Sequence, residues 1–383
     1  MEDNVEKKIK WKKIVIFISI IIICVILATV IKLGIDAIIV NKEMQTAQHG
    51  ITINKDVHLY SSANETRKYK NLEIGTDTYI LNEVIDKRGN KWYKVKVEKK
   101  VGYILANDVG KYQDSYNKRD LMVDVSKFNL QNNFNNIGEF KAFLIKNDIK
   151  FVYIRAGGRG YGKAGNLYTD PKADEYAKAC DFLNIPFGYY FLDEALNSEE
   201  IDEEVSFIKN YLNEHYYKNN ILPIALDVEK HLEKGRADDI WDKRYELINE
   251  LVEKLEKENK NVILYSNADL ANEYLTNVNA KMWLAYYPKI NKIPDYWYSK
   301  TNEKCASNKE IIAKLIGWQF TQSGVENNIN EKVDLSLVYS NYLLNNSMED
   351  IENDIKENRE MVFGPILNFK EKIIEGVENI LNK

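Results

Sequence analysis

Hydrophobic and polar positions follow three successive patterns along this chain of 383 residues. An unbroken apolar stretch runs from Ile14 to Ile31, and short alternating segments follow between Ile51 and Tyr112. From Leu121 onward, short apolar runs alternate with longer stretches of helical spacing. Alternation at every second residue is typical of strands, and recurrence at three and four residues is typical of amphipathic helices. The pattern therefore predicts a membrane helix, a small β module and a larger α/β domain.

The apolar stretch has the length and composition of a membrane anchor. As a helix, Ile14–Ile31 spans about 27 Å, close to the roughly 30 Å of a bilayer core. Five lysines lie within residues 1–13, and the positive-inside rule places this basic tail in the cytoplasm. We expect residues 14–40 to form an uncleaved single-pass anchor, with the rest of the chain on the extracytoplasmic side. A cleaved signal peptide is the alternative, but the run is long for one and no small-x-small motif follows it.

Residues 51–112 have the pattern of a small all-β module. Gly75 and Arg88-Gly-Asn90 supply turn residues between short alternating segments. Several short strands within about 60 residues are typical of a small β-barrel. The four expected strands are Val57–Tyr60, Asp77–Leu81, Lys91–Val97 and Val101–Ile104.

Residues 120–343 alternate buried strands with amphipathic helices, which favours a parallel sheet. Seven or eight such units in one domain are typical of a TIM-like (β/α) barrel. Helices are expected at Asp170–Leu183, Ser198–Tyr217 and Trp241–Glu258, among others. The expected strands are Leu121–Val125, Phe151–Ala156, Pro186–Phe191, Ile221–Val228, Val262–Tyr265, Met282–Tyr286 and Leu315–Gln319.

Polar residues recur where these strands end, and barrels of this kind place their active sites at those ends. Asp227 and Glu229 share one face of their strand, about 6.6 Å apart along it. Neighbouring carboxylates resist joint ionisation, so the pair favours a site that holds one carboxyl protonated and the other charged. Alternatively, the two acids cap the next helix or pair with Lys230 and Lys234. The other strand ends carry Asp124, Arg155, Tyr190, Tyr265, Tyr287 and Gln319.

Seven motifs follow one another along the larger domain. They are Met122-Val-Asp-Val-Ser-Lys-Phe128, Phe151–Gly157, Asn184–Tyr190, Leu222–Glu229, Met282–Tyr286, Gly317–Thr321 and Val333–Leu335. In this order they resemble glycoside hydrolase family 25, the muramidase-type lysozymes, over essentially all of residues 120–343. The chain departs from that family at Phe128, Phe191 and Tyr286, where Trp, His and Gln are usual. These departures fall at sugar-contacting positions and bear on glycan preference more than on the acids.

The resemblance assigns roles to four acids. It implies that Glu229 is the general acid at the bond between N-acetylmuramic acid and N-acetylglucosamine, with a charged Asp227 favouring its protonated form. To Asp124 and Asp334 it assigns orientation of the substrate and stabilisation of the oxocarbenium-like transition state. Retaining and inverting hydrolysis both stay open, because the sequence does not give the distance between the two catalytic carboxyl groups. That distance is about 5–5.5 Å in retaining enzymes and about 6.5–9.5 Å in inverting ones.

Sugar contacts are expected from side chains at the same strand ends. We favour Tyr190 and Trp318 for stacking on sugar rings, since for any other single aromatic a core position is the better interpretation. Arg155 either touches substrate or pairs with an acid. Cys180 and Ser266 fit less well as nucleophiles, because Cys180 has no nearby His in sequence and Ser266 lacks a Gly-x-Ser-x-Gly elbow. The expected substrate-binding set is Tyr190, Trp318, Gln319, Tyr265, Trp283, Tyr287 and Arg155.

In the β module, Lys91–Val97 followed by Val101–Ile104 resembles the bacterial Src-homology-3-like domain. Members of that family commonly accompany cell-wall enzymes and often bind peptidoglycan. Here His58-Leu-Tyr-Ser-Ser-Ala63 replaces the usual Asn-x-Arg-x-Gly-Pro segment. Wall binding and a spacer role therefore both stay open for this module.

The composition indicates which classes of partner and cofactor are not expected. A net charge of −5 with intermixed acids and lysines indicates no nucleic-acid binding. The histidines have no metal-ligand spacing and there is no Cys-x-x-Cys pair, so we expect no metal and no cofactor. Cys180 and Cys305 either form a disulfide or are two buried thiols.

Residues 346–383 lie beyond the resemblance and are expected to form a helical tail. Met348–Glu360 is highly charged, Gly364-Pro365 interrupts it, and an apolar stripe from Ile366 to Leu381 follows on one helix face. Four roles are open for this stripe: docking on the barrel, self-association, binding of an envelope protein partner, or contact with a membrane surface. We favour docking or self-association, because the polar face carries as many acids as lysines.

Together these features predict a membrane-anchored muramidase whose catalytic domain faces the cell wall and acts on peptidoglycan. A free phage lysin fits less well, because an anchor would hold it to the host membrane. The alternative is a non-catalytic peptidoglycan-binding scaffold of a cell-envelope or conjugation apparatus. The complete set of four acids favours the enzyme, since a scaffold does not need it.

Overall fold

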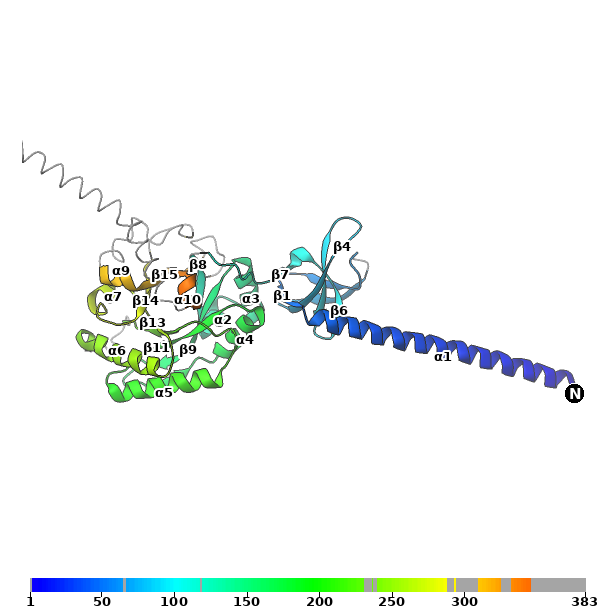
Figure 1. Ribbon diagram of the computed structural model, residues 1–383, viewed down its shortest axis with the longest axis horizontal. Helices are drawn as coiled ribbons and strands as arrows, with labels where there is room; N and C mark the ends of the chain where they lie inside the picture. Colours follow the sequence, from blue (N-terminus) through cyan, green and yellow to red (C-terminus); the bar gives the residue numbers. More distant parts are fainter. Residues whose placement is uncertain are drawn as a thin grey trace, which may run out of the picture. The chain divides into compact units, whose positions relative to one another are not determined.

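The computed structural model describes residues 2–64, 67–117, 119–230, 236, 240–287, 293, 309–324 and 332–345. The chain divides into two compact units, residues 1–109 and 110–383, each of which is described by itself (Figure 1). The expected tail at residues 346–383 and Cys305 lie outside the described residues.

The first unit begins with one long helix, α1 (Glu2–Met44). An 18-residue stretch within its segment Ile16–Met44 has a mean hydropathy of 3.0 and is not buried, so the helix is long and apolar enough to cross a membrane. An anchor and a signal sequence both have these properties. Only three residues separate the end of α1 from the first strand, and Glu43 forms an ion pair of 2.6 Å with Lys94 of the following module.

The rest of the first unit is an antiparallel sheet, as the alternating pattern predicts. All four expected strands are present, and β1, β3 and β7 were not expected. The Src-homology-3-like family stays a prediction, because the sheet alone does not assign it. The strands are β1 (Gln48–Thr52), β2 (Val57–Tyr60), β3 (Lys68–Leu72), β4 (Asp77–Ile85), β5 (Lys91–Val97), β6 (Lys100–Leu105) and β7 (Val109–Gly110), in the order β3-β2-β6-β5-β4-β1-β7.

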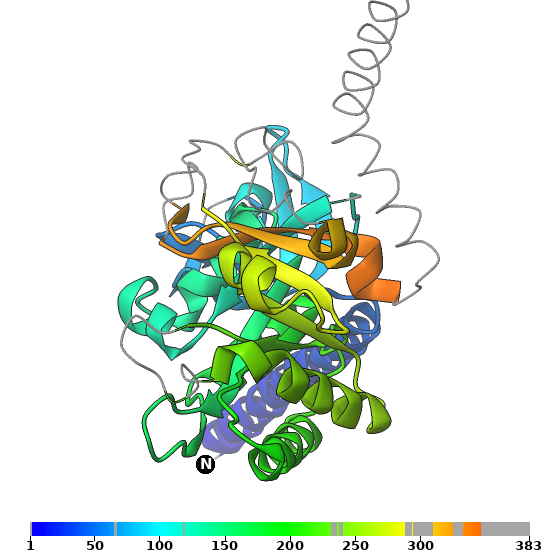
Figure 2. The ribbon, with the colours of Figure 1, turned by 90° about the vertical axis from the view of Figure 1, so that its left-hand side faces the viewer.

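The second unit is a closed barrel of eight strands (Figure 2). Neighbouring strands are parallel, except that the last strand is antiparallel to both of its neighbours. All seven strands expected from the sequence are found, and the antiparallel closing strand is the one that the pattern missed. The barrel strands are β8 (Arg119–Val125), β9 (Phe151–Arg159), β11 (Phe187–Leu192), β12 (Ile224–Asp227), β13 (Val262–Asn267), β14 (Lys281–Ala285), β15 (Leu315–Thr321) and β16 (Asp334–Tyr339). A short edge strand, β10 (Leu167–Thr169), pairs antiparallel with β9.

Amphipathic helices cover the outside of the barrel. Their starts are fixed by side chains of the kind that cap helices: Asn136, Asn197 and Asn267 each accept a backbone N–H of the first turn. The three helices placed from sequence are α4, α5 and α6, and α5 ends three residues earlier than expected. The helices are α2 (Lys127–Asn132), α3 (Ile137–Lys146), α4 (Ala173–Leu183), α5 (Ser198–Glu214), α6 (Trp241–Lys257), α7 (Ala268–Tyr274), α9 (Lys309–Lys314) and α10 (Ser340–Asn345).

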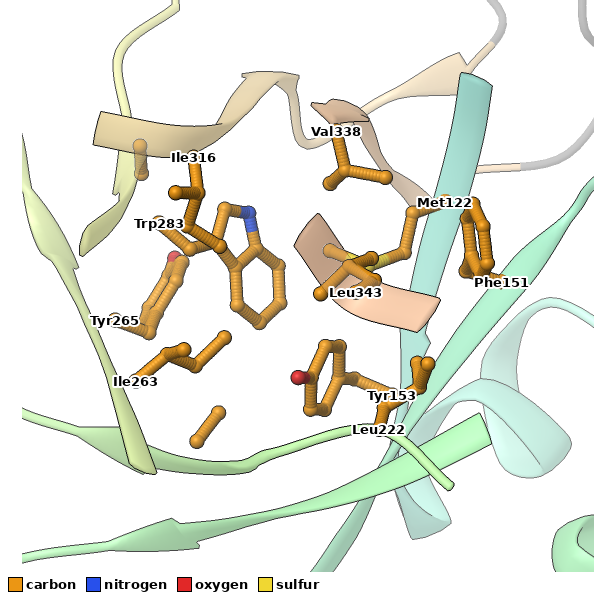
Figure 3. Close-up of a cluster of buried hydrophobic side chains, with 12 residues drawn as sticks. Met122, Phe151, Tyr153, Leu222, Ile263, Tyr265, Trp283, Ile316, Val338 and Leu343 are labelled. Carbon is orange, nitrogen blue, oxygen red and sulfur yellow. The ribbon is translucent and has the colours of Figure 1, made fainter. Parts of the chain in front are cut away.

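Buried hydrophobic side chains, four of them aromatic, form a cluster in the barrel (Figure 3). Trp283 lies between Tyr153 and Tyr265, with ring centroids 5.2 and 4.6 Å away, and its indole N–H donates to the Ser336 hydroxyl at 2.9 Å. Leu343 of α10 belongs to the same cluster. Closely packed aromatic rings with satisfied polar groups form a rigid floor, because every large side chain has a fixed neighbour.

Gly317 allows this stack to lie against the backbone of β15. A Cβ at this position would lie 2.8 Å from Cδ1 of Trp283, whereas a Cβ at Gly162 would meet nothing within 4 Å. We therefore expect Gly317→Ala to lower the free energy of unfolding by about 1–3 kcal/mol through overpacking. Urea unfolding followed by tryptophan fluorescence measures this, with Gly162→Ala as the matched control. Equal stability of the two variants would show that the floor is not tightly packed here.

Candidate active site

Four carboxyl side chains come together at one end of the barrel. Asp124 lies near the end of β8, Asp227 ends β12, and Glu229 follows two residues later. Asp334 begins β16, and because β16 runs antiparallel, its first residue reaches the same rim as the last residues of the parallel strands. Asp334 pairs directly with Asp124 in the strand register. The four acids line a cavity of about 280 Å³ together with Arg155, Tyr190, Tyr265, Trp283, Tyr287 and Gln322.

Burial and mutual repulsion raise the pKa values of these acids. Burial raises the pKa of Asp124 well above its usual range, and the charges of Asp334 and Glu229 add to it. The pKa of Asp227 is also raised well above its usual range, first by burial and then by Glu229 and Asp124, while Arg155 acts in the opposite direction. Burial, and then Glu229, raise the pKa of Asp334 from 3.8 to about 6. The cluster therefore retains protons at a pH where isolated carboxyl groups are ionised.

Gln319 holds Asp124 in place from below. Its amide N–H donates to Oδ2 of Asp124 at 2.8 Å, and its amide oxygen accepts the hydroxyls of Tyr265 at 2.9 Å and Tyr287 at 2.5 Å. The two hydroxyl donors fix which end of the amide faces the acid. Gln319 is buried, so its contact is with Asp124 rather than with the open cavity.

Arg155 pairs with an acid that the sequence did not indicate. Its Nε and a terminal nitrogen both lie 2.9 Å from Oδ2 of Asp170. The guanidinium also lies over the ring of Phe128, 5.2 Å from its centroid. Of the two roles expected for Arg155, ion pairing is the one observed, and the arginine still lines the cavity. The sequence places Asp170 at the start of a helix, whereas it directly follows β10, a strand of three residues that gives no periodic signal.

The expected aromatic contacts divide into three groups. Tyr190 lines the cavity, and Tyr265 and Trp283 form its buried floor. Tyr287 is 44% exposed and is the aromatic of this set most open to a ligand. Trp318 does not reach the cavity: it is fully buried, and its indole N–H donates to the carbonyl of Tyr286 at 2.9 Å.

A second, larger cavity of about 590 Å³ adjoins the first. Both cavities are lined by Glu229, Tyr287 and Gln322, so Glu229 stands between them. The expected set did not include Gln322, although it follows the end of β15 directly, as site residues of a barrel do.

The alternative nucleophiles are not placed for catalysis. The Ser266 hydroxyl is buried and donates to the carbonyl of Val228 at 2.8 Å. Cys180 is a buried free thiol whose pKa is raised by burial, which disfavours the reactive thiolate. Within the described part of the chain, no group of three or more His, Cys, Asp or Glu side chains is arranged to hold a metal ion.

Residues 123–329 match the model of the glycosyl hydrolases family 25. Among curated proteins, none matches this chain.

Several solved structures resemble the chain at low identity. The Clostridium perfringens spore cortex lytic enzyme SleM is 21% identical with a TM-score of 0.45, and the match covers 62% of this chain and 71% of that one. The modular autolysin LytC from Streptococcus pneumoniae, in complex with a synthetic peptidoglycan ligand, is 20% identical with a TM-score of 0.42, over 68% of this chain and 59% of the autolysin. The catalytic domain of endolysin ply40 from bacteriophage P40 of Listeria monocytogenes is 19% identical with a TM-score of 0.43, over 63% and 99% of the two chains.

The raised pKa of Asp334 has a consequence for stability. The folded protein binds a proton there more tightly than the unfolded chain does, so this group lowers stability as pH rises from about 4 to about 6, and the penalty is complete above that. Asp334→Asn removes the penalty. Relative to the unmodified protein, the variant should gain about 2–3 kcal/mol of unfolding free energy between pH 4 and pH 7. Urea unfolding at both pH values measures this, with the exposed Asp242→Asn as control. A stability difference that does not change with pH would contradict the assignment.

Proposed function

This chain belongs to the glycosyl hydrolases family 25, and we propose that its barrel hydrolyses the β-1,4 bond between N-acetylmuramic acid and N-acetylglucosamine in peptidoglycan. One observation carries the proposal: four carboxyl groups line a single cavity, in which burial and mutual repulsion raise the pKa values of Asp124, Asp227 and Asp334. Glycoside hydrolysis needs a protonated carboxyl to release the leaving oxygen and a charged one to stabilise the sugar cation, both at the same time.

The positions of the four acids support a division of roles among them. Glu229 lies on the wall common to both cavities, where a glycosidic oxygen between two bound sugars can reach it, and we take it as the general acid. Asp124, Asp227 and Asp334 surround the smaller cavity, where the positive charge of the transition state develops. Gln319 orients Asp124 through its hydrogen bond of 2.8 Å. Tyr287, half-exposed beside Glu229, offers a ring face to a sugar.

A scaffold that binds peptidoglycan without cleaving it has no use for this arrangement. Buried carboxyls of raised pKa weaken the fold at neutral pH, and such groups concentrate at functional sites. The cluster therefore favours the enzyme over the scaffold.

Replacing the general acid tests the enzyme directly. Glu229→Gln keeps the shape of the side chain but cannot supply the proton, so the rate of reducing-end release from insoluble peptidoglycan should fall about 10²–10⁴-fold. The exposed Glu246→Gln, on α6, is the matched control and should keep full activity. If the full chain purified in detergent sediments with the wall but releases no reducing ends, the scaffold replaces the enzyme.

We further propose that residues 14–40 remain attached as an anchor, with residues 1–13 in the cytoplasm and the barrel facing the wall. The five lysines of the tail and the apolar helix support this orientation. The ion pair of Glu43 with Lys94 and the short turn after Met44 join the helix directly to the β module. An anchor joined in this way would keep the β module close to the outer surface of the membrane that the helix crosses.

Protease treatment of intact spheroplasts tests this topology. With an epitope tag before Met1, we expect the tag to survive inside the cell on a fragment that stays in carbonate-washed membranes, while the barrel is digested. Mature protein that is released into the medium and begins after residue 40 would show a cleaved signal sequence instead.

A further inference from the structure

The larger cavity beside Glu229 has a lining of its own. It is formed by Glu229 and Lys230 after β12, residues 267–269 where β13 gives way to α7, residues 285–287 at the end of β14, and Gln322. Ala268 and Ala285 are small, which leaves room between the strand ends. At about 590 Å³ it is about twice the size of the acid-lined cavity, with which it shares Glu229, Tyr287 and Gln322.

The chemistry of the reaction indicates which part of the substrate this cavity would hold. A general acid protonates the oxygen that leaves, so the leaving part of the substrate lies on the far side of that acid from the carboxylates that stabilise the sugar cation. Asp124, Asp227 and Asp334 all line the smaller cavity, and none of them lines the larger one. The larger cavity therefore lies on the leaving-group side.

Lys230 brings a positive charge to the larger cavity, which the acids Glu229 and Asp269 also line. Two cations line the two cavities in the described part of the chain, Arg155 and Lys230. Arg155 is committed to Asp170 at 2.9 Å. Lys230 is exposed and forms no ion pair with any described residue. An open ammonium beside a site with four acids is suited to a group of opposite charge on an incoming substrate.

We propose that the larger cavity holds the leaving-group side of the glycan and that Lys230 binds there a carboxylate carried by the substrate. This deepens the proposed function and rests on it. The leaving sugar, N-acetylglucosamine, carries no carboxylate, so the group belongs to the muramic acid beyond it: a carboxylate of the attached peptide or, where the peptide has been removed, the freed lactyl carboxylate. The chemistry is the same for both, and Lys230 serves as a specificity determinant for charged glycan over neutral glycan.

Binding measured without turnover tests the inference separately from the enzyme. The full chain carrying Glu229→Gln is titrated with soluble peptidoglycan fragments by calorimetry, alone and combined with Lys230→Met, Lys230→Arg or Lys218→Met. Lys218 is an exposed lysine before β12, at the opposite end of that strand, and is the matched control. Lys230→Met should weaken binding about tenfold, the value of one charge-assisted hydrogen bond, while Lys230→Arg and Lys218→Met should not.

Fragments with altered charge identify the group. When all carboxyl groups are converted to amides, the difference between Lys230 and Lys230→Met should vanish. Fragments without peptide carry a free lactyl carboxylate: a difference seen only with these assigns the lactyl group, one seen only with peptide-bearing fragments assigns the peptide, and one seen with both shows that Lys230 accepts either carboxylate. Equal binding by Lys230 and Lys230→Met, a difference that survives amidation, or no binding at all would overturn the inference. Loss of hydrolysis by the unmodified protein, with the Lys230 effect intact, would overturn the proposed function alone.

Discussion

The site depends on one constraint: several carboxyl groups are crowded together and buried at one rim of the barrel. Asp124, Asp227 and Asp334 are held close to one another and to Glu229, and each pays for burial with a raised pKa. Such an arrangement persists only where the surrounding structure is rigid, since freely moving side chains would separate like charges. The stacked floor around Trp283 and the amide of Gln319 supply that rigidity. Fold and site are therefore linked, because the rigid barrel keeps the acids close together despite their mutual repulsion.

Much of the fold was predictable because parallel strands buried on both faces read as continuous apolar runs. The seven parallel strands were found in this way, and the family expected from the motif order is confirmed. The closing strand β16 was missed for a physical reason. It runs antiparallel to both of its neighbours, so it does not belong to the series of parallel strands that the pattern indicated. The three-residue strand β10 is too short to give any periodic signal.

The site was predictable in its acids and less so in its aromatics. Carboxyl groups at strand ends have few structural explanations, which makes them informative. Aromatic residues are suited both to protein cores and to sugar binding, and the direction in which the side chain points determines which role it has. Trp318 is the neighbour of Gln319 on β15, so its side chain points to the opposite face of the strand from the residue that contacts Asp124. Tyr287, beyond the end of β14, lines the cavity. Asp170 escaped notice because its role depends on Arg155, fifteen residues away in sequence.

The most direct test of this account is the chemical identity of the new chain end. Peptidoglycan is digested with the full chain in water enriched in ¹⁸O, and the released fragments are sequenced by mass spectrometry. The account predicts ¹⁸O at the reducing carbon of N-acetylmuramic acid, because water replaces the leaving N-acetylglucosamine there. Label on N-acetylglucosamine ends, or on peptide carboxyl groups, would contradict it.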